Sequence, residues 1–258
     1  MNDLPSDKPH KGVYILPSLV TTASLFVGFF AIIQANQGKF ELAAIAVFVS
    51  MILDGLDGRI ARWTNTASDF GKEYDSLVDV VSFGLTPALV MFEWSLSDYG
   101  KLGWLSAFLY VACTALRLAR FNSHDVKDKR YFQGLPCPAA ASFVAAWIWI
   151  MEEYQVGGES LGPVSIVIML FAAFAMVSSL PYKSFKDFDP KNKIPFVGLV
   201  LVAVPFVLIA FDPPRVLFLL FLVYLLSGPV VWFKLRKNGS DQDDDDTPAD
   251  PTPPVSQG

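Results

Sequence analysis

Four aspartates in one short stretch are the residues best suited to chemistry. Asp54 and Asp57 stand three positions apart, and Asp75 and Asp79 stand four apart. On a helix, either spacing puts both side chains of a pair on one face. Residues 63–70 are long enough for a turn between two antiparallel helices, which would bring all four carboxylates to one depth at the membrane boundary. Carboxylates there need a compensating partner.

Three partners fit such a cluster: basic side chains, protons or cations. Arg59 and Arg62 follow directly and suffice for two charges. Hard cations explain the whole set better, because Mg²⁺ and Mn²⁺ prefer oxygen ligands. Two ions bridged by carboxylates are a recurring device for displacement at phosphorus. Ordinary solvated acids at helix ends would explain either pair alone, but the four together favour a site for divalent metal.

Small residues accompany these carboxylates. Gly58 and Ala61 are three positions apart and leave a strip without large side chains. Such a strip either lets two helices approach closely or lets a flat base or ribose lie against the backbone. Gly71 alone is equally consistent with a simple turn.

The elements that must position this cluster are apolar blocks. The chain has 258 residues, 53% of them hydrophobic and 17% charged, with a mean hydropathy of +0.42. A bilayer-spanning helix needs about 20 mostly apolar residues. We predict an all-α, polytopic transmembrane helix bundle of about eight spans, with the first retained rather than cleaved as a signal peptide. The expected spans are residues 14–35, 42–61, 75–94, 102–120, 136–151, 163–180, 194–211 and 214–233.

The basic residues predict an orientation. With eight spans, 17 of the 20 Lys and Arg residues fall on the side of the two termini. The positive-inside rule then puts both termini and the aspartates on the cytoplasmic side, in a bacterial-type inner membrane. We divide the chain into a cytoplasmic segment (1–12), a membrane-embedded catalytic domain (13–237) and a disordered acidic, Pro-rich tail (238–258). Cys113 and Cys137 have no metal-binding spacing and are interpreted as packing residues.

The stretch 54–79 resembles a known family signature. The pattern D-x-x-D-G-x-x-A-R-x8-G-x3-D-x3-D is similar to that of the CDP-alcohol phosphatidyltransferases, and every defining position is filled. Flanking segments resemble one branch, the membrane-integral CDP-diacylglycerol–serine O-phosphatidyltransferases. The segments are FGKEYDSLVDVVSFGLTP (70–87), LRLARFN (116–122) and FQGLPCP (132–138). The resemblance covers roughly residues 12–190.

The resemblance implies a metal-dependent transferase. The phosphatidyl group of CDP-diacylglycerol would pass to the hydroxyl of L-serine, giving phosphatidylserine and CMP. Asp54, Asp57 and Asp75 would bind Mg²⁺ or Mn²⁺, as two ions. Asp79 would complete the cluster and serve as the base for the acceptor hydroxyl. The CDP moiety would lie against Asp54, Gly58, Ala61, Arg62 and Gly71.

Serine must be recognised by its carboxylate, ammonium and hydroxyl groups. Arg117 and Arg120 are three positions apart, and arginine suits bidentate carboxylate binding. We expect one to bind the serine carboxylate and the other a phosphate, although both equally fit interfacial anchors. Gln133 and Ser82 are further candidates, each also consistent with packing or backbone hydrogen bonding.

Two other functions compete with serine transfer. An acceptor such as choline, inositol phosphate or glycerol phosphate would keep the same metal site. A cation transporter would need acidic residues near the midplane of several spans, and the later spans contain almost none. The bilayer and the two substrates are the expected partners. The resemblance also implies a homodimer, and we expect no nucleic-acid partner.

Overall fold

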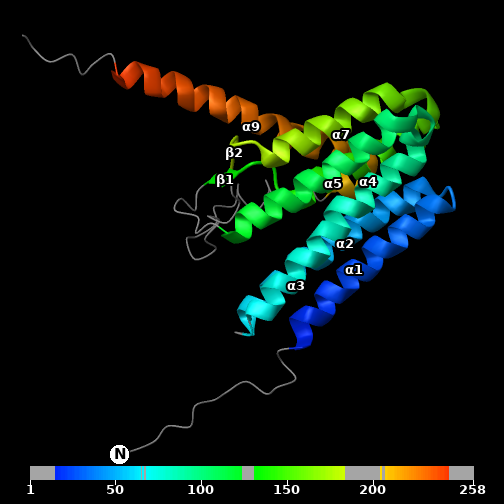
Figure 1. Cartoon of the computed structure of the whole chain (residues 1–258), viewed down its shortest axis with the longest axis horizontal. Helices are drawn as coiled ribbons and strands as arrows, with labels where there is room; N and C mark the ends of the chain where they lie inside the picture. Colours follow the sequence, from blue (N-terminus) through cyan, green and yellow to red (C-terminus); the bar gives the residue numbers. More distant parts are fainter. Residues whose placement is uncertain are drawn as a thin grey trace, which may run out of the picture.

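The computed structural model describes residues 15–64, 66, 68–123, 131–183, 204 and 207–243. Most of the helices run side by side along one direction, and a small sheet lies at one end (Figure 1). The α-helices of the described residues are α1 (Ile15–Asn36), α2 (Phe40–Trp63), α3 (Asp69–Asp79), α4 (Thr86–Met91), α5 (Gly100–Ser123), α6 (Cys137–Glu153), α7 (Gly162–Val177) and α9 (Pro213–Asp243).

α1 and α2 form a tight hairpin. Gly38 closes the turn with a φ of +73°, a conformation that glycine adopts without strain. Small buried residues such as Ala31 and Ala43 let the two helices pack closely. Ser24 and Ser50 each donate to the backbone carbonyl of the other, at 3.0 and 3.1 Å. The hairpin therefore supports the end of α2 that carries Asp54 and Asp57.

The next segment is helical from Asp69 to Tyr99 but changes its winding. α3 begins at Ser68, whose side chain accepts a hydrogen bond from the Gly71 N–H. It passes into the π-helix η2 (Val80–Leu85), then α4, the π-helix η3 (Phe92–Leu96) and the 3₁₀ turn η4 (Ser97–Tyr99). Gly100, with a φ of +51°, ends this run before α5 turns back. The predicted span 75–94 therefore starts earlier, at Asp69.

A two-stranded sheet follows α5 and α7. β1 (Tyr131–Gln133) pairs antiparallel with β2 (Pro181–Lys183), so that Gln133 lies opposite Pro181. The sequence did not predict these strands. We expected helix through residue 180, but α7 ends at Val177 because Ser178 is extended and Pro181 lacks the N–H that a helix needs. After the short 3₁₀ turn η5 (Gly158–Leu161), α7 brings β2 back to the end of α5.

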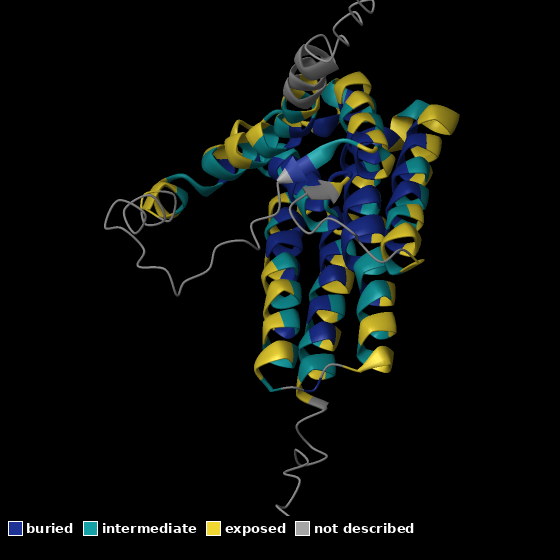
Figure 2. Ribbon diagram, turned by 90° about the vertical axis from the view of Figure 1, so that its left-hand side faces the viewer, coloured by how far each residue is buried: buried dark blue, intermediate teal, exposed yellow. Residues whose placement is uncertain are grey.

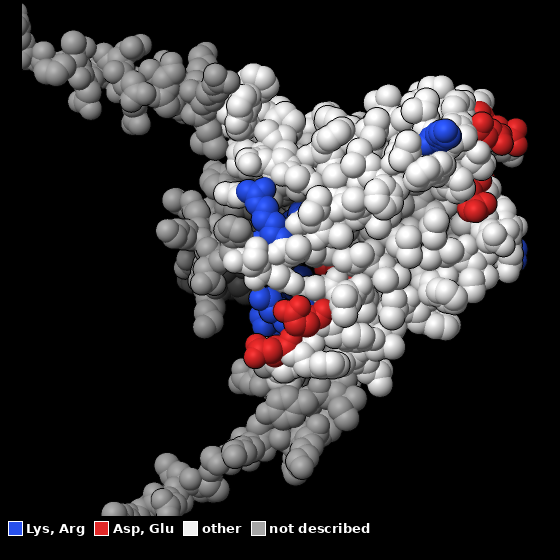
Figure 3. All heavy atoms as spheres, in the orientation of Figure 1, with Lys and Arg blue, Asp and Glu red and all other residues white. Residues whose placement is uncertain are grey.

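The core is centred on α6. Its Ala140, Val144 and Ile148 are fully buried, and Figure 2 shows buried residues concentrated along the inner faces of the helices. Large apolar side chains, among them Phe26 and Phe108, are exposed on the outside. Figure 3 shows charged side chains at the two ends of the bundle and an almost uncharged surface between them. This is the surface expected of a protein that crosses a bilayer.

The described helices account for part of the predicted membrane spans. Four helical stretches of the described chain are long and apolar enough to cross a membrane: Leu16–Asn36, Asp69–Ser123, Gly158–Val177 and Pro213–Phe233. The second contains two predicted spans, separated at Gly100. The predicted span 194–211 lies mostly outside the described residues. The chain is a helical multi-pass protein, and the count of eight is not confirmed.

The predicted division at residues 12 and 238 stays a prediction. Residues 1–14 and 244–258 lie outside the described part of the chain. α9 is helical as far as Asp243.

Candidate active site

Three of the four aspartates meet at one point. Carboxylate oxygens of Asp54, Asp57 and Asp75 all lie within 4.8 Å of one another. Asp79 is outside this group of three, but its carboxyl is within hydrogen-bonding contact of Asp54. α2 supplies two of these carboxylates and α3 the other two, as the spacing predicted.

The cluster lacks the usual compensation for buried acids. Asp57 is only 5% exposed, and one oxygen each of Asp75 and Asp79 is buried without a hydrogen-bond partner. Among the residues that the structure describes, no Lys or Arg forms an ion pair with any of the four. An ionised carboxylate buried without a partner is costly. The oxygen donors and their unmet valences fit a hard divalent cation.

Thr21 of α1 is a site residue for which the sequence predicted no role. Its hydroxyl lies 2.6 Å from Oδ2 of Asp57 and 3.0 Å from the carbonyl oxygen of Pro17. The hydroxyl has a single proton, and donating it to Asp57 gives the stronger, charge-assisted bond. The contact fixes the orientation of the Asp57 carboxylate. The signals in the sequence were a polar residue within an apolar helix and its place in the N-terminal part of the family resemblance.

The residues predicted to hold CDP surround the end of α2. An ideal Cβ on Gly58 would lie 3.7 Å from Nη1 of Arg62, so this guanidinium already lies beside the strip. The Ala61 carbonyl accepts from the Thr66 N–H, which shapes the turn after the helix. Gly71 donates its N–H to Ser68 and thus belongs to the cap of α3. Its capping contact is a structural role that the sequence did not reveal.

Arg117 lies on the inner side of α5. Its Nη1 donates to the Sγ of Cys137 across 3.4 Å, and its Nε is buried without a partner. Cys137 is fully buried at the first turn of α6 and is close enough to Asp79 to interact with it electrostatically. Cys137 is thus a buried core residue, as predicted, that also accepts the Arg117 hydrogen bond. It lies between the inner arginine and the aspartate cluster.

Arg120 is exposed and donates hydrogen bonds to β1 and to the end of α7. Its Nη2 donates to Oε1 of Gln133 over 2.6 Å, and its Nη1 donates to the carbonyl of Val177 over 3.4 Å. Two of the predicted acceptor residues are thus in direct contact. Ser82 differs, since it is fully buried and its unpartnered Oγ points toward Gly28 of α1.

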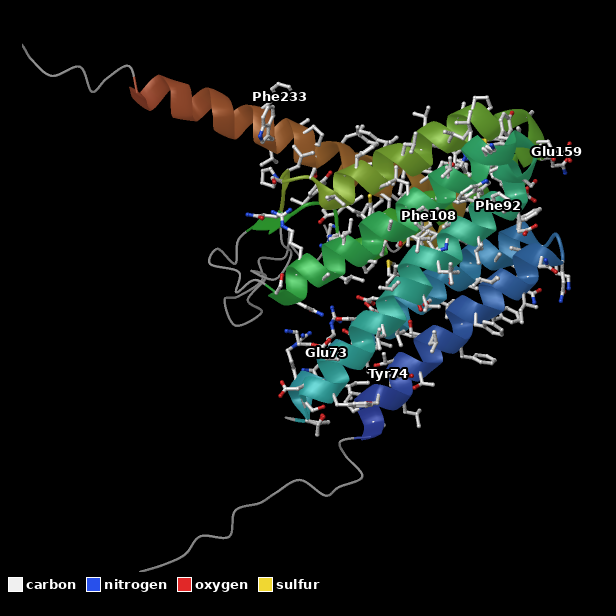
Figure 4. All side chains as sticks on the ribbon, viewed as in Figure 1. Glu73, Tyr74, Phe92, Phe108, Glu159 and Phe233 are labelled. Carbon is white, nitrogen blue, oxygen red and sulfur yellow. The ribbon has the colours of Figure 1, made fainter. Side chains whose placement is uncertain are left out.

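A side-chain hydrogen bond connects α5 with α3. Asn122, near the end of α5, donates to Oγ of Ser76 in α3 over 2.8 Å. This contact ties the arginine-bearing helix to the helix that carries Asp75. Figure 4 labels Glu73 and Tyr74 at this end of the molecule and Glu159 at the opposite end. Figure 3 shows that acidic and basic side chains gather closely at the same end as Glu73.

The fold and the site define a class: a multi-pass helical membrane protein with a cluster of acidic side chains at one end of its bundle. The sequence model of the CDP-alcohol phosphatidyltransferase family matches residues 14–180. The chain belongs to this family. The resemblance found in residues 54–79 is thereby confirmed at the level of the family.

Curated relatives cover most of the chain. A CDP-diacylglycerol–serine O-phosphatidyltransferase of Helicobacter pylori is 35% identical over 88% of this chain and 94% of its own length. A protein of the same name from Methanocaldococcus jannaschii is 30% identical over 86% of this chain and 96% of its own length. An archaetidylserine synthase of Methanothermobacter thermautotrophicus is 33% identical over 69% and 73%, respectively.

Proposed function

We propose that this chain transfers the phosphatidyl group of CDP-diacylglycerol to the hydroxyl of L-serine, giving phosphatidylserine and CMP. One observation carries the proposal: Asp54, Asp57 and Asp75 bring together, from two helices, carboxylates that form no ion pair with any described Lys or Arg. Family membership and the serine-transferring names of the relatives support it. The relative from Methanothermobacter thermautotrophicus differs in the lipid that its name gives, and serine is the feature that the names share.

Asp54, Asp57 and Asp75 would hold the divalent metal, Mg²⁺ or Mn²⁺, with Asp79 as a further ligand and two ions in all. When bound, the metal neutralises the diphosphate and polarises the phosphorus under attack. Thr21 keeps the Asp57 carboxylate in one orientation through its 2.6 Å hydrogen bond. A ligand held in this way needs no reorganisation when the cation arrives.

The reaction exchanges one P–O bond for another. The serine hydroxyl oxygen attacks the phosphorus that carries the diacylglycerol. The bond from that phosphorus to the bridging oxygen breaks, and CMP leaves with the electron pair. The hydroxyl proton passes to a carboxylate, for which we propose Asp79. Asp79 lies outside the group of three and has one oxygen without a partner, which supports a role in proton transfer.

The nucleotide would lie along the strip at the end of α2. Gly58 and Ala61 present little side chain there, and the exposed Arg62 lies beside Gly58. Arg62 would neutralise part of the diphosphate charge. Gly71 would contact the nucleotide from the cap of α3. Asp54 would lie between the nucleotide and the metal.

The acceptor would bind between α5 and the sheet. The inner Arg117, with its unpartnered Nε, is proposed to contact a phosphate oxygen. The exposed Arg120, held by Gln133, is proposed to bind the serine carboxylate. Ser82 is also proposed to line the acceptor pocket. Because it contacts α1, it is the most remote of the four proposed acceptor residues.

We also propose that the protein lies in the inner membrane, with both termini and the site on the cytoplasmic side, and that it forms a homodimer.

The experiment that tests the function is an acceptor panel on the purified protein. CMP release from CDP-diacylglycerol is followed with metal and, in turn, serine, choline, inositol phosphate or glycerol phosphate. We expect release with serine only. Release that is independent of serine, or faster with another acceptor, would contradict the proposal.

A further inference from the structure

One tyrosine joins α9 to the sheet. Tyr182 of β2 is fully buried, and its hydroxyl donates to the backbone carbonyl of Leu225 over 3.1 Å. Pro229 stands four residues after Leu225, inside α9. Proline has no N–H, so it leaves the carbonyl four residues earlier without its usual helical donor. The Tyr182 hydroxyl supplies the hydrogen bond that Pro229 removes.

α9 also makes room for the tyrosine ring. A Cβ on Gly228 would lie 2.3 Å from Cζ of Tyr182, a distance that no real contact allows. The ring of Tyr224, one turn earlier, packs against Tyr182 with centroids 5.6 Å apart. We call the four residues Tyr224, Leu225, Gly228 and Pro229 the α9 socket. Gly228 thus leaves space for the Tyr182 ring, and Pro229 leaves the Leu225 carbonyl free to accept a hydrogen bond from the Tyr182 hydroxyl.

The hydroxyl is in the right protonation state to donate. Burial, with a smaller contribution from neighbouring Tyr224, raises the pKa of Tyr182 to about 12. The group therefore keeps its proton at neutral pH. The hydrogen bond to Leu225 persists throughout the physiological range.

The socket is linked to the candidate acceptor site through the sheet. Tyr182 lies opposite Phe132 in the β1–β2 pair, and Gln133 is the next residue of β1. Gln133 accepts the 2.6 Å hydrogen bond from Arg120. The pairing continues beyond the strands, because the Gly134 N–H donates to the carbonyl of Leu180 over 2.9 Å. The strand anchored by Tyr182 is thus the one that supports the partner of Arg120.

We propose that Tyr182 is a positioning residue for the acceptor: seated in the α9 socket, it fixes the sheet and, through Gln133, the guanidinium of Arg120. The proposal rests on the proposed serine transfer and deepens it. It gives α9, which lies outside the matched residues 14–180, a role in acceptor binding. In Figure 1, α9 passes beside β2 before leaving the bundle, as this role requires.

The test uses three substitutions in the full-length protein. Tyr182→Phe leaves the Leu225 carbonyl without a donor, and the ring shifts as water reaches it. Serine KM should rise about tenfold, the effect expected when the displaced Arg120 loses one hydrogen bond to the serine carboxylate, while kcat and the KM for CDP-diacylglycerol stay near wild type. Gly228→Ala should expel the ring and have the same effect.

Pro229→Ala supplies the rescue. It restores an N–H at position 229, so the Leu225 carbonyl is satisfied within the helix and the ring stays seated. The double variant Tyr182→Phe/Pro229→Ala should regain a near-wild-type serine KM. Pro229→Ala should not rescue Gly228→Ala, because the clash with the ring remains. A merely structural role would lower stability without this selective effect on KM.

Hydrogen exchange gives a second readout that does not depend on catalysis. The Gly134 and Leu135 amides, which donate to Leu180 and Ala175, should exchange faster in Tyr182→Phe and at the wild-type rate in the double variant. Unchanged exchange and unchanged serine KM in both Tyr182→Phe and Gly228→Ala would overturn the proposal and leave serine transfer intact. Should Tyr182→Phe not fold, the double variant must fold, and its failure would also overturn the proposal. A wild-type enzyme without serine-dependent CMP release refutes the proposed function instead, and the exchange data still decide the role of the socket.

Discussion

At the scale of single residues, the site depends on carboxylates that have no basic partner within the described part of the chain. Asp57 is the most constrained, because α2 positions its backbone and Thr21 of α1 binds its Oδ2. A buried acid that accepts hydrogen bonds but forms no ion pair keeps its negative charge available to a cation. We therefore expect the pairing of Thr21 with Asp57 to affect metal affinity more than the fold.

Replacing Thr21 tests this pairing. Thr21→Val keeps the shape and removes the donor, so the half-saturating Mn²⁺ concentration should rise about tenfold, as expected for a lost hydrogen bond to a charged group. Turnover at saturating metal should stay near wild type. Mn²⁺ binding measured by electron paramagnetic resonance gives the affinity without an assay, and Thr21→Ser is the matched control. Equal affinities in Thr21→Val and wild type would contradict the role of this hydroxyl.

Substitution of the two arginines should affect different kinetic parameters, because we propose that each contacts a different substrate. Arg120→Lys keeps the charge but loses the bidentate geometry and the hydrogen bond to Gln133. Serine KM should rise about tenfold or more, because hydrogen bonds to charged groups contribute about 1.5–3 kcal/mol. Arg117→Lys should instead lower kcat and leave serine KM little changed. Kinetics that vary serine and CDP-diacylglycerol separately check both. Wild-type serine KM and turnover in both variants would exclude them from the site.

At the scale of elements, the sequence predicted the helices better than the junctions between them. The α2 and α3 faces that carry the aspartates follow from a spacing of three and four residues. β1 and β2 did not, because three-residue strands leave no alternating pattern and their pairing joins segments far apart in the chain. Contacts such as Arg120 with Gln133 depend on that pairing. The candidate residues were therefore predictable as residue types, and their partners were not.

Gly134 tests the junction between the sheet and α6. Its φ is +78°, and a Cβ would lie 2.2 Å from the carbonyl oxygen of Met176. Gly134→Ala should lower the free energy of unfolding by about 2–3 kcal/mol through combined strain and overlap. Gly157→Ala is the matched control, since nothing lies within 4 Å of that position. Thermal unfolding in detergent compares them. Equal melting temperatures would show that this turn tolerates a side chain.

At the scale of the whole molecule, charge is separated from apolar surface. Glu73 and Glu159 lie at opposite ends of the bundle, and the exposed Phe108 lies between them (Figure 4). The distribution of Lys and Arg in the sequence predicts that the end with Glu73 faces the cytoplasm. The position of the site then follows from topology, since serine and CMP are water-soluble and the lipid is not.

Cysteine labelling tests this orientation. Glu73→Cys and Glu159→Cys are both at exposed positions, and the native Cys113 and Cys137 are buried. A membrane-impermeant maleimide added to intact cells should label Glu159→Cys only. After permeabilisation it should label both. Labelling of Glu73→Cys in intact cells would reverse the predicted topology.

We propose that aspartates from α2 and α3 jointly bind the metal on which phosphatidyl transfer depends. The most direct measurement is serine-dependent CMP release by Asp57→Asn as Mn²⁺ is titrated. Asparagine keeps the shape and can still accept from Thr21, but it lacks the charge. We predict that turnover falls at least about a hundredfold at every metal concentration, as expected when a charged group that stabilises the transition state is lost. Wild-type turnover at the same half-saturating Mn²⁺ would contradict the account.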